Sequence, residues 1–218
     1  MERARLKSRR LRTAMALAAL ATVAAAISLV WPQFSGDVGS AAMKAGLEPA
    51  AAPGGPFSLL DHTGKRVSDQ TFRGSFLLIF FGYTYCPDFC PTTLQAIALA
   101  MDTLGGKSAR IRPLFITIDP ERDTPEALAS YVGAFGHRIV GLTGTPEEIR
   151  KVANEYRVYF AKSRTGRPGD GDTSHYTVDH SAFTYLMGPD GKYLTHFAYG
   201  VPPQTMAKAI RQYIDNWK

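Results

Sequence analysis

Cysteine is scarce in this chain of 218 residues: only Cys86 and Cys90 are present, with three residues between them. A thioredoxin-type redox site separates its cysteines by two residues, and a structural zinc site usually supplies four ligands. The pair matches neither pattern directly, so a disulfide, a redox couple and a metal site all remain open. The apolar segment near the N-terminus is not directly followed by a cysteine, so the lipid anchor of a bacterial lipoprotein is excluded.

Charge is also scarce once the N-terminus is set aside. Residues 1–12 hold six Lys or Arg and one Glu, so they supply +5 of the net charge of +6 and leave about +1 for the rest. A nucleic-acid-binding domain would need a basic surface of its own. We therefore expect no nucleic-acid partner, and we interpret residues 1–12 as a basic cytoplasmic tail.

Residues 13–31 contain no charged side chain. Nineteen residues at 1.5 Å each just span a bilayer core of about 30 Å, and the basic flank predicts a cytoplasmic N-terminus. The sequence thus predicts a single-pass transmembrane anchor over 13–31, with everything after it on the far side of the membrane. A cleaved signal peptide, which would also export the domain, and an Arg-rich mitochondrial presequence are the alternatives.

A linker separates this anchor from the folded part of the chain. Of the 25 residues in 32–56, fifteen are Pro, Gly or Ala, and no apolar period runs through them. We therefore place the folded domain at residues 57–218.

Strand patterns alternate with helix patterns in this domain. Apolar runs at 76–81 and 114–118 predict strands buried on both faces, and Thr-Pro-Glu at 124–126 and 145–147 predicts two helix starts. Hairpins are expected around residues 63–64 and 188–191, with a short strand at 139–142 and a final helix reaching Trp217. The pattern predicts an α/β, thioredoxin-like fold: a central, mostly parallel sheet with an antiparallel hairpin and helices on both faces.

The position of the cysteines favours chemistry over simple cross-linking. They follow the first long strand and open a helix, because Cys90 precedes Pro91 at a helix N-terminus, where unpaired N–H groups favour a thiolate. A stabilising disulfide remains an alternative, but it would close a very small loop. Two thiolates alone are a poor zinc site, whereas two thiolates with one imidazole suit Cu(I).

Five histidines could supply that imidazole: His62, His137, His175, His180 and His196. The first three lie in expected turns, loops or helix ends, and His196 lies inside the last strand. His180 directly precedes the strand expected at 182–187, which enters the sheet opposite the cysteines in a thioredoxin fold. It is therefore the candidate third ligand, although the spacing alone leaves this open.

Three motifs together resemble the Sco/SenC family: YTYCPDFCPTTLQ, TIDPERDTPE (117–126) and VDHSAFTYLMGPDGKY (178–193). Members of this family are membrane-anchored copper proteins with a thioredoxin fold that serve cytochrome c oxidase assembly. The resemblance covers about residues 55–218 and implies that Cys86, Cys90 and His180 bind copper. It implies a copper metallochaperone, a binding protein rather than an enzyme, for the binuclear copper centre of oxidase subunit II.

The resemblance also leaves a second function open, which is thiol–disulfide reduction of the cysteines of subunit II by Cys86 and Cys90. A peroxiredoxin-type peroxidase fits less well, because it needs no dithiol facing a histidine. We expect a bacterial inner membrane location with a periplasmic domain, the mitochondrial inner membrane being the alternative; the copper donor is unknown. Among nearby acidic residues, Asp179 is a candidate to orient His180, Asp88 could mark a docking surface, and Asp119 fits a turn.

Overall fold

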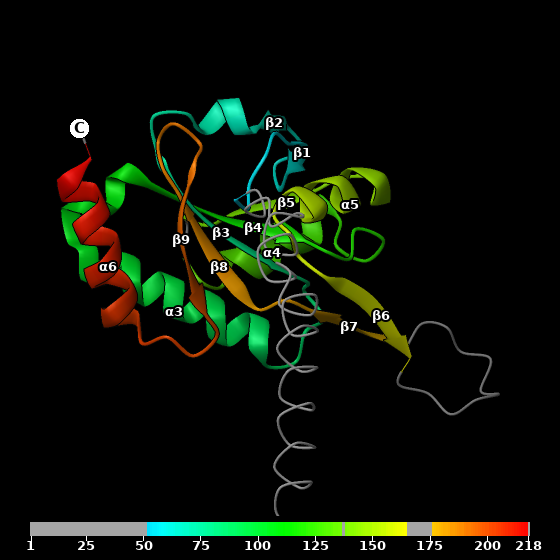
Figure 1. Ribbon diagram of the computed structural model, residues 1–218. Helices are drawn as coiled ribbons and strands as arrows, with labels where there is room; N and C mark the ends of the chain where they lie inside the picture. Colours follow the sequence, from blue (N-terminus) through cyan, green and yellow to red (C-terminus); the bar gives the residue numbers. More distant parts are fainter. Residues whose placement is uncertain (1–51, 137, 165–175, 218) are drawn as a thin grey trace, which may run out of the picture. The chain divides into compact units, whose positions relative to one another are not determined.

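The computed structural model describes residues 52–136, 138–164 and 176–217 (Figure 1). The expected basic tail at 1–12, the expected anchor at 13–31 and most of the expected linker lie outside these residues. Within them, no helix combines the length and the apolarity needed to cross a bilayer. Packing begins slightly before Phe57, because the backbone N–H of Gly54 donates to the carbonyl oxygen of Glu155 at 2.8 Å.

A seven-stranded sheet forms the centre of the domain (Figure 1), in the order β2-β1-β5-β4-β3-β8-β9. Its strands are β1 (Ser58–Asp61), β2 (Arg66–Ser68), β3 (Phe76–Gly82), β4 (Ile111–Thr117), β5 (Val140–Thr143), β8 (Phe183–Met187) and β9 (Tyr193–Ala198). The expected hairpins β1–β2 and β8–β9 are both present.

The expectation of a mostly parallel sheet was wrong. Only β3–β4 and β4–β5 are parallel, while β1–β2, β1–β5, β3–β8 and β8–β9 are antiparallel. The helical crossovers after β3 and β4 produce the parallel centre, because parallel neighbours need long connections. Each terminal hairpin then adds an antiparallel edge, so the sheet is mixed.

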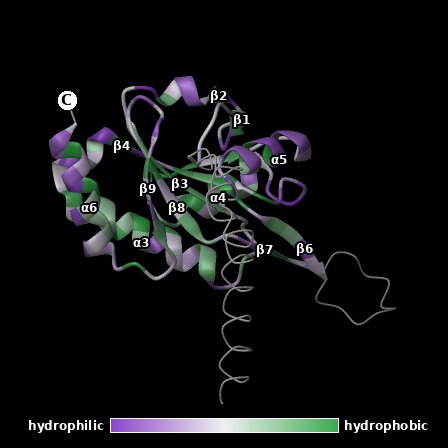
Figure 2. Cartoon of the chain, in the orientation of Figure 1, coloured by the Kyte–Doolittle hydropathy of each residue, from purple (hydrophilic) through white to green (hydrophobic). Residues whose placement is uncertain are grey.

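In the described residues, four α-helices cover the sheet: α3 (Phe89–Leu104), α4 (Pro125–Gly133), α5 (Pro146–Glu155) and α6 (Pro203–Asn216). A short 3-10 turn, η1 (Asp69–Phe72), lies between β2 and β3, and another, η2 (Gly105–Arg110), lies between α3 and β4. The expected starts of α4 and α5 are confirmed. Thr124 and Thr145 cap them by accepting hydrogen bonds from backbone N–H groups, each followed by proline. In Figure 2 the central strands are green, whereas α5 presents purple residues outward.

The helices lie on both faces of the sheet. On one face, the rings of Phe80 and Phe115 lie 6.1 Å apart, and Phe115 packs against Tyr131 of α4. Helices α3 and α6 lie side by side (Figure 1). On the other face, the ring of Phe81 contacts Tyr156 at the end of α5. The carboxyl ends of β3 and β4 meet at one edge, where the site lies.

A second, two-stranded sheet was not expected. Strands β6 (Phe160–Arg164) and β7 (Tyr176–His180) pair antiparallel with each other and have no ladder to the main sheet. This excursion of the chain begins after Tyr159 and ends before Ser181, whose backbone N–H donates to the carbonyl oxygen of Tyr159 at 3.0 Å. It carries His180 as its last strand residue.

Candidate metal centre

The two cysteines lie in the turn from β3 to α3. The side chains of all seven β3 residues are buried, and α3 begins at Phe89, two residues before the expected Pro91. Asp88 is the N-cap residue, but its side chain makes no capping hydrogen bond. Instead, the N–H of Cys90 donates to Cys86 Sγ at 3.4 Å. The free N–H groups of the helix start therefore stabilise a negative sulfur on Cys86.

Gly82 makes room for the second sulfur. A Cβ at position 82 would lie 2.7 Å from Cys90 Sγ and 2.8 Å from Cε2 of Phe115. Both distances are well below van der Waals contact, so no larger residue fits without moving the sulfur or the ring. Cys90 has no exposed surface, and its sulfur lies against the backbone at the end of β3.

His180 approaches the cysteines from the second sheet. Its Nε2 lies 3.7 Å from Cys90 Sγ, and its Nδ1 lies 3.0 Å from the carbonyl oxygen of Ser181. A carbonyl can only accept, so Nδ1 carries the proton and Nε2 presents its lone pair toward the sulfur. The expectation that Asp179 orients this ring was wrong: no hydrogen bond joins the two among the described residues, and Asp179 is exposed because neighbouring strand residues point to opposite faces.

Together these side chains form a cluster that could hold a metal ion. One ligand atom each from Cys86, Cys90 and His180 lie within 4.8 Å of one another, and no other group of three such residues occurs in the described parts of the chain. The structure thus brings together the three residues that sequence analysis selected. Two soft thiolates and one imidazole are a donor set suited to Cu(I), whereas structural zinc would lack a fourth protein ligand here.

The thiols of Cys86 and Cys90 differ in pKa. A hydrogen bond from the Cys90 thiol, with further support from the Cys90 N–H, lowers the pKa of Cys86 to about 4 despite its burial. The same hydrogen bond, together with burial, raises the pKa of Cys90. The reduced pair therefore carries one negative charge on Cys86, with the remaining proton on Cys90 between the two sulfurs.

The centre opens to solvent on one side. Cys86 and His180 line a cleft of about 390 Å³ together with Tyr83, Pro87 and Phe89, whereas Cys90 does not reach it. Phe89, which lines the cleft, and Tyr85, next to Cys86 in the chain, are both exposed. An incoming molecule would therefore reach Cys86 and His180 before Cys90.

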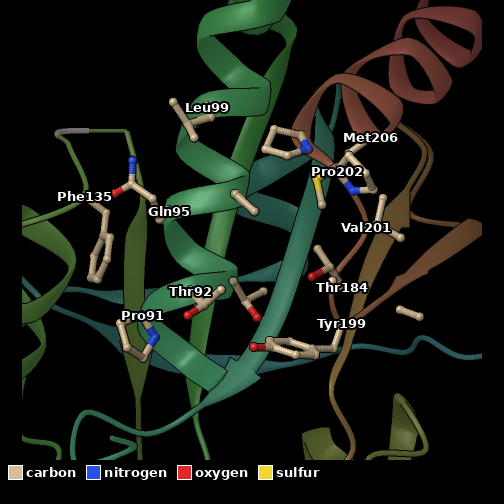
Figure 3. A pocket seen from close by; sticks show the side chains of 15 residues that line it. Pro91, Thr92, Gln95, Leu99, Phe135, Thr184, Tyr199, Val201, Pro202 and Met206 are labelled. Carbon is tan, nitrogen blue, oxygen red and sulfur yellow. The ribbon is translucent and has the colours of Figure 1, made fainter. Parts of the chain in front are cut away.

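A second hollow lies beside the first, between α3 and the turn into α6. Its volume is about 590 Å³, and Figure 3 shows Leu99 and Gln95 on one side with Val201 and Met206 on the other. The ring of Tyr199, which lines this hollow, packs edge-on against Phe89 at 4.8 Å. Phe89 therefore separates the two depressions.

Two other histidines lie within the described residues, and neither joins the centre. Nδ1 of His62 accepts a hydrogen bond from the N–H of Gly141, and His196 packs among aromatic rings on the outer strand β9. His137 and His175 lie outside the described residues.

Of two acidic residues after β4, sequence analysis assigned Asp119 to a turn and did not consider Asp123. Asp119 and Asp123 are both fully buried. Asp119 pairs with Arg122, and Asp123 accepts hydrogen bonds from Thr84 and Thr117. Burial raises the pKa of Asp123, an effect that these hydrogen bonds oppose. Two aspartates in one short segment, DPERD, were the only sequence signal.

Comparisons with known proteins agree with this arrangement. Protein sco1 of Schizosaccharomyces pombe is 44% identical over 73% of this chain, and the mitochondrial SCO1 homologue of Homo sapiens is 46% identical over 72%. The matched part covers 60% and 51% of those two proteins, so the chain spans little more than half of their length.

Solved structures match the same part of the chain. The copper-bound ScoI of Arabidopsis thaliana aligns with a TM-score of 0.69 and 38% identity, covering 76% of this chain and all of that one. The copper-bound ScoI of Bradyrhizobium japonicum aligns at 0.66 and 42%, covering 74% and 99%. The thioredoxin-like α/β fold is thereby confirmed. Since the SCO1/SenC family model also matches residues 45–215, this chain belongs to the SCO1/SenC family.

Proposed function

We propose that the domain binds one copper ion through Cys86, Cys90 and His180 and assists assembly of the binuclear copper centre of cytochrome c oxidase subunit II. The observation that carries this proposal is the approach of the three ligand atoms to within 4.8 Å of one another. The copper-bound structures of ScoI relatives support the choice of metal. In this role copper is cargo, and the protein is a binding protein rather than an enzyme.

Each of the three residues would contribute to copper binding in a different way. Cys86 presents a preformed thiolate, and the ion would displace the proton held on Cys90. His180 offers Nε2, because the carbonyl of Ser181 keeps the ring proton on Nδ1. Copper bound here would remain accessible through the cleft that Cys86 and His180 line, as transfer to a partner requires.

A second function, thiol–disulfide reduction, is favoured by the inequality of the two thiols. The exposed-side thiolate of Cys86 would attack one sulfur of a partner disulfide, forming a mixed disulfide and releasing one partner thiolate. Cys90, after losing its proton, would then attack Cys86 Sγ and release the second thiolate. The partner gains two electrons, and Cys86 and Cys90 end as a disulfide.

The variant His180→Ala separates the two functions. It should leave disulfide formation intact but lower copper affinity by at least about 10–100-fold, because it removes one of three ligands. In cells, copper delivery predicts that oxidase assembly fails as badly as in Cys86→Ser, and exposed His196→Ala is the matched control. Normal assembly with His180→Ala at limiting copper would refute delivery and leave reduction.

Location and attachment belong to the same proposal. We place the domain on the exported side of a bacterial inner membrane, held by an uncleaved segment at 13–31, with the mitochondrial inner membrane as the alternative. The basic flank at 1–12 supports this orientation. The copper donor stays unidentified.

A further inference from the structure

His180 and the cysteines lie on separate parts of the fold, so specific contacts must hold them close together. The cysteines follow β3 of the main sheet, whereas His180 ends β7 of a separate two-stranded sheet. No backbone ladder joins the two sheets among the described residues. A two-stranded ribbon is only marginally stable by itself, so side-chain contacts must hold the histidine in place.

The segment 118–124, between β4 and α4, contacts the cysteine turn on one side. Asp123 accepts hydrogen bonds from Thr84 at both carboxylate oxygens, from N–H at 3.0 Å and from Oγ1 at 2.6 Å. Thr84 lies two residues before Cys86. Thr117, at the end of β4, donates to the same carboxylate at 2.6 Å. Asp123 therefore ties the start of the cysteine turn to the main sheet.

The same segment contacts the histidine strand on its other side. Tyr176, the first residue of β7, donates its hydroxyl to Asp119 Oδ1 at 2.7 Å, and Arg122 Nη1 donates to the carbonyl oxygen of Tyr176 at 3.2 Å. The guanidinium carbon of Arg122 lies 3.7 Å from the centre of the Tyr176 ring. Asp119 has no exposed surface and pairs with Nε of Arg122, so the guanidinium is fixed in orientation.

Arg122 also reaches the cysteine turn. Its guanidinium carbon lies 4.6 Å from the ring centre of Tyr85 and 5.8 Å from that of Tyr83, both just before Cys86. Its Nη2 is buried and has no hydrogen-bond partner among the described residues. A planar guanidinium between aromatic rings can tolerate this, because it is weakly hydrated and attracted to their faces. Arg122 is thus one side chain in contact with both ligand-bearing segments.

We infer that Arg122, oriented by Asp119, is a positioning residue that fixes β7 against the cysteine turn and thereby secures the nitrogen ligand of the copper site. The inference rests on the proposed copper binding. Arg122 touches no ligand atom itself. Its effect is confined to the nitrogen side of the site, because the two cysteines are fixed by β3, α3 and Asp123.

The test compares Arg122→Met with Arg66→Met in the full chain. Arg66 pairs with Glu148 in an exposed ion pair, so its loss is the matched control. In Arg122→Met we expect copper affinity to fall about 10–100-fold, the range for lost support of a ligand. Copper K-edge absorption should keep two sulfur neighbours and lose the nitrogen. In the reduced, metal-free protein, backbone amides of 176–180 should exchange hydrogen faster, while those of β3 stay protected.

Arg122→Lys is the second variant, because it retains the charge beside Asp119 while losing the planar group that stacks on the tyrosines. The same loss of nitrogen and of hairpin protection is expected. If either variant folds with wild-type copper affinity, nitrogen signal and exchange, the positioning role is refuted. A loss of thermal stability alone, without these changes, also refutes it. A wild-type chain that binds no copper would instead refute the proposed function.

Discussion

Replacement of Gly82 by alanine tests the packing beneath the metal centre. The new methyl group would lie 2.7 Å from Cys90 Sγ and 2.8 Å from Phe115 Cε2. Normal contacts are about 3.5–4.0 Å, so the sulfur or the ring must move by about 1 Å. Both side chains are fully buried, so neither can move outward into solvent. Overpacking of this kind costs about 1–3 kcal/mol, equivalent to roughly 2–12 °C in the unfolding midpoint of a domain of this size.

The same displacement of the Cys90 sulfur should weaken copper binding. A thiolate–metal bond is about 2.3 Å long, so a sulfur moved by about 1 Å can no longer share the ion with Cys86 and His180 without distortion. We expect copper affinity to fall at least about 10-fold. Thermal unfolding and competition titration against a copper chelator measure the two effects on the same preparation.

Gly133→Ala is the control for this experiment. Gly133 ends α4, and a Cβ there would meet nothing within 4 Å, so alanine should be neutral or stabilise the helix by about 0.5–1 kcal/mol. A Gly82→Ala protein with the unfolding midpoint and copper affinity of Gly133→Ala would show that the sulfur is not confined as the distances imply.

Three further predictions concern the cysteines and the N-terminus. The first is the rate at which iodoacetamide alkylates Cys86 in the reduced, metal-free protein. This rate should stay nearly constant from pH 8 to about pH 5, because the thiolate is the reactive form and exists above the pKa of about 4. The rate should fall only as the pH drops through that pKa. An ordinary thiol of pKa about 8.5 would slow tenfold per unit over this range. In Cys90→Ala, which loses the thiol hydrogen bond but keeps the backbone N–H, we expect the fall to begin at a higher pH than in the unmodified protein. Oxidation to a Cys86–Cys90 disulfide should abolish copper binding, because the metal needs thiolates; equal copper titrations of both forms would contradict this. Mass spectrometry of the membrane-purified protein should detect residues 13–31, whereas a mature N-terminus beyond Trp31 would indicate a cleaved signal.

Much of the fold could be predicted because its signals are local. The apolar run of β3 and the Thr-Pro pairs before α4 and α5 each determine their own element. Strand direction is not local: nothing in the residues of β8 says that it pairs antiparallel with β3. The β6–β7 ribbon escaped prediction because most of its described side chains are partly exposed, so no strict apolar alternation marks it.

The site was predictable to a similar degree. Spacing and position identified Cys86 and Cys90 as a functional pair. Of the five histidines, position before a strand made His180 the candidate ligand, and the resemblance to a family decided the choice. The burial of Asp119 could not be predicted, because its partner Tyr176 lies 57 residues further along the chain. Nor could the orientation of the imidazole, which depends on the carbonyl of Ser181 rather than on the neighbouring carboxylate.

The excursion formed by β6 and β7 makes the metal ligand set modular. The chain leaves the main sheet after Tyr159 and returns toward it at Ser181, and these two residues are hydrogen bonded to each other. Whatever lies between them can change in length without altering the register of the main sheet. A dithiol fold of this kind could therefore gain or lose a histidine ligand by a single insertion or deletion. The same junction offers protein engineers a place to exchange one loop-borne ligand for another while the cysteine turn stays intact.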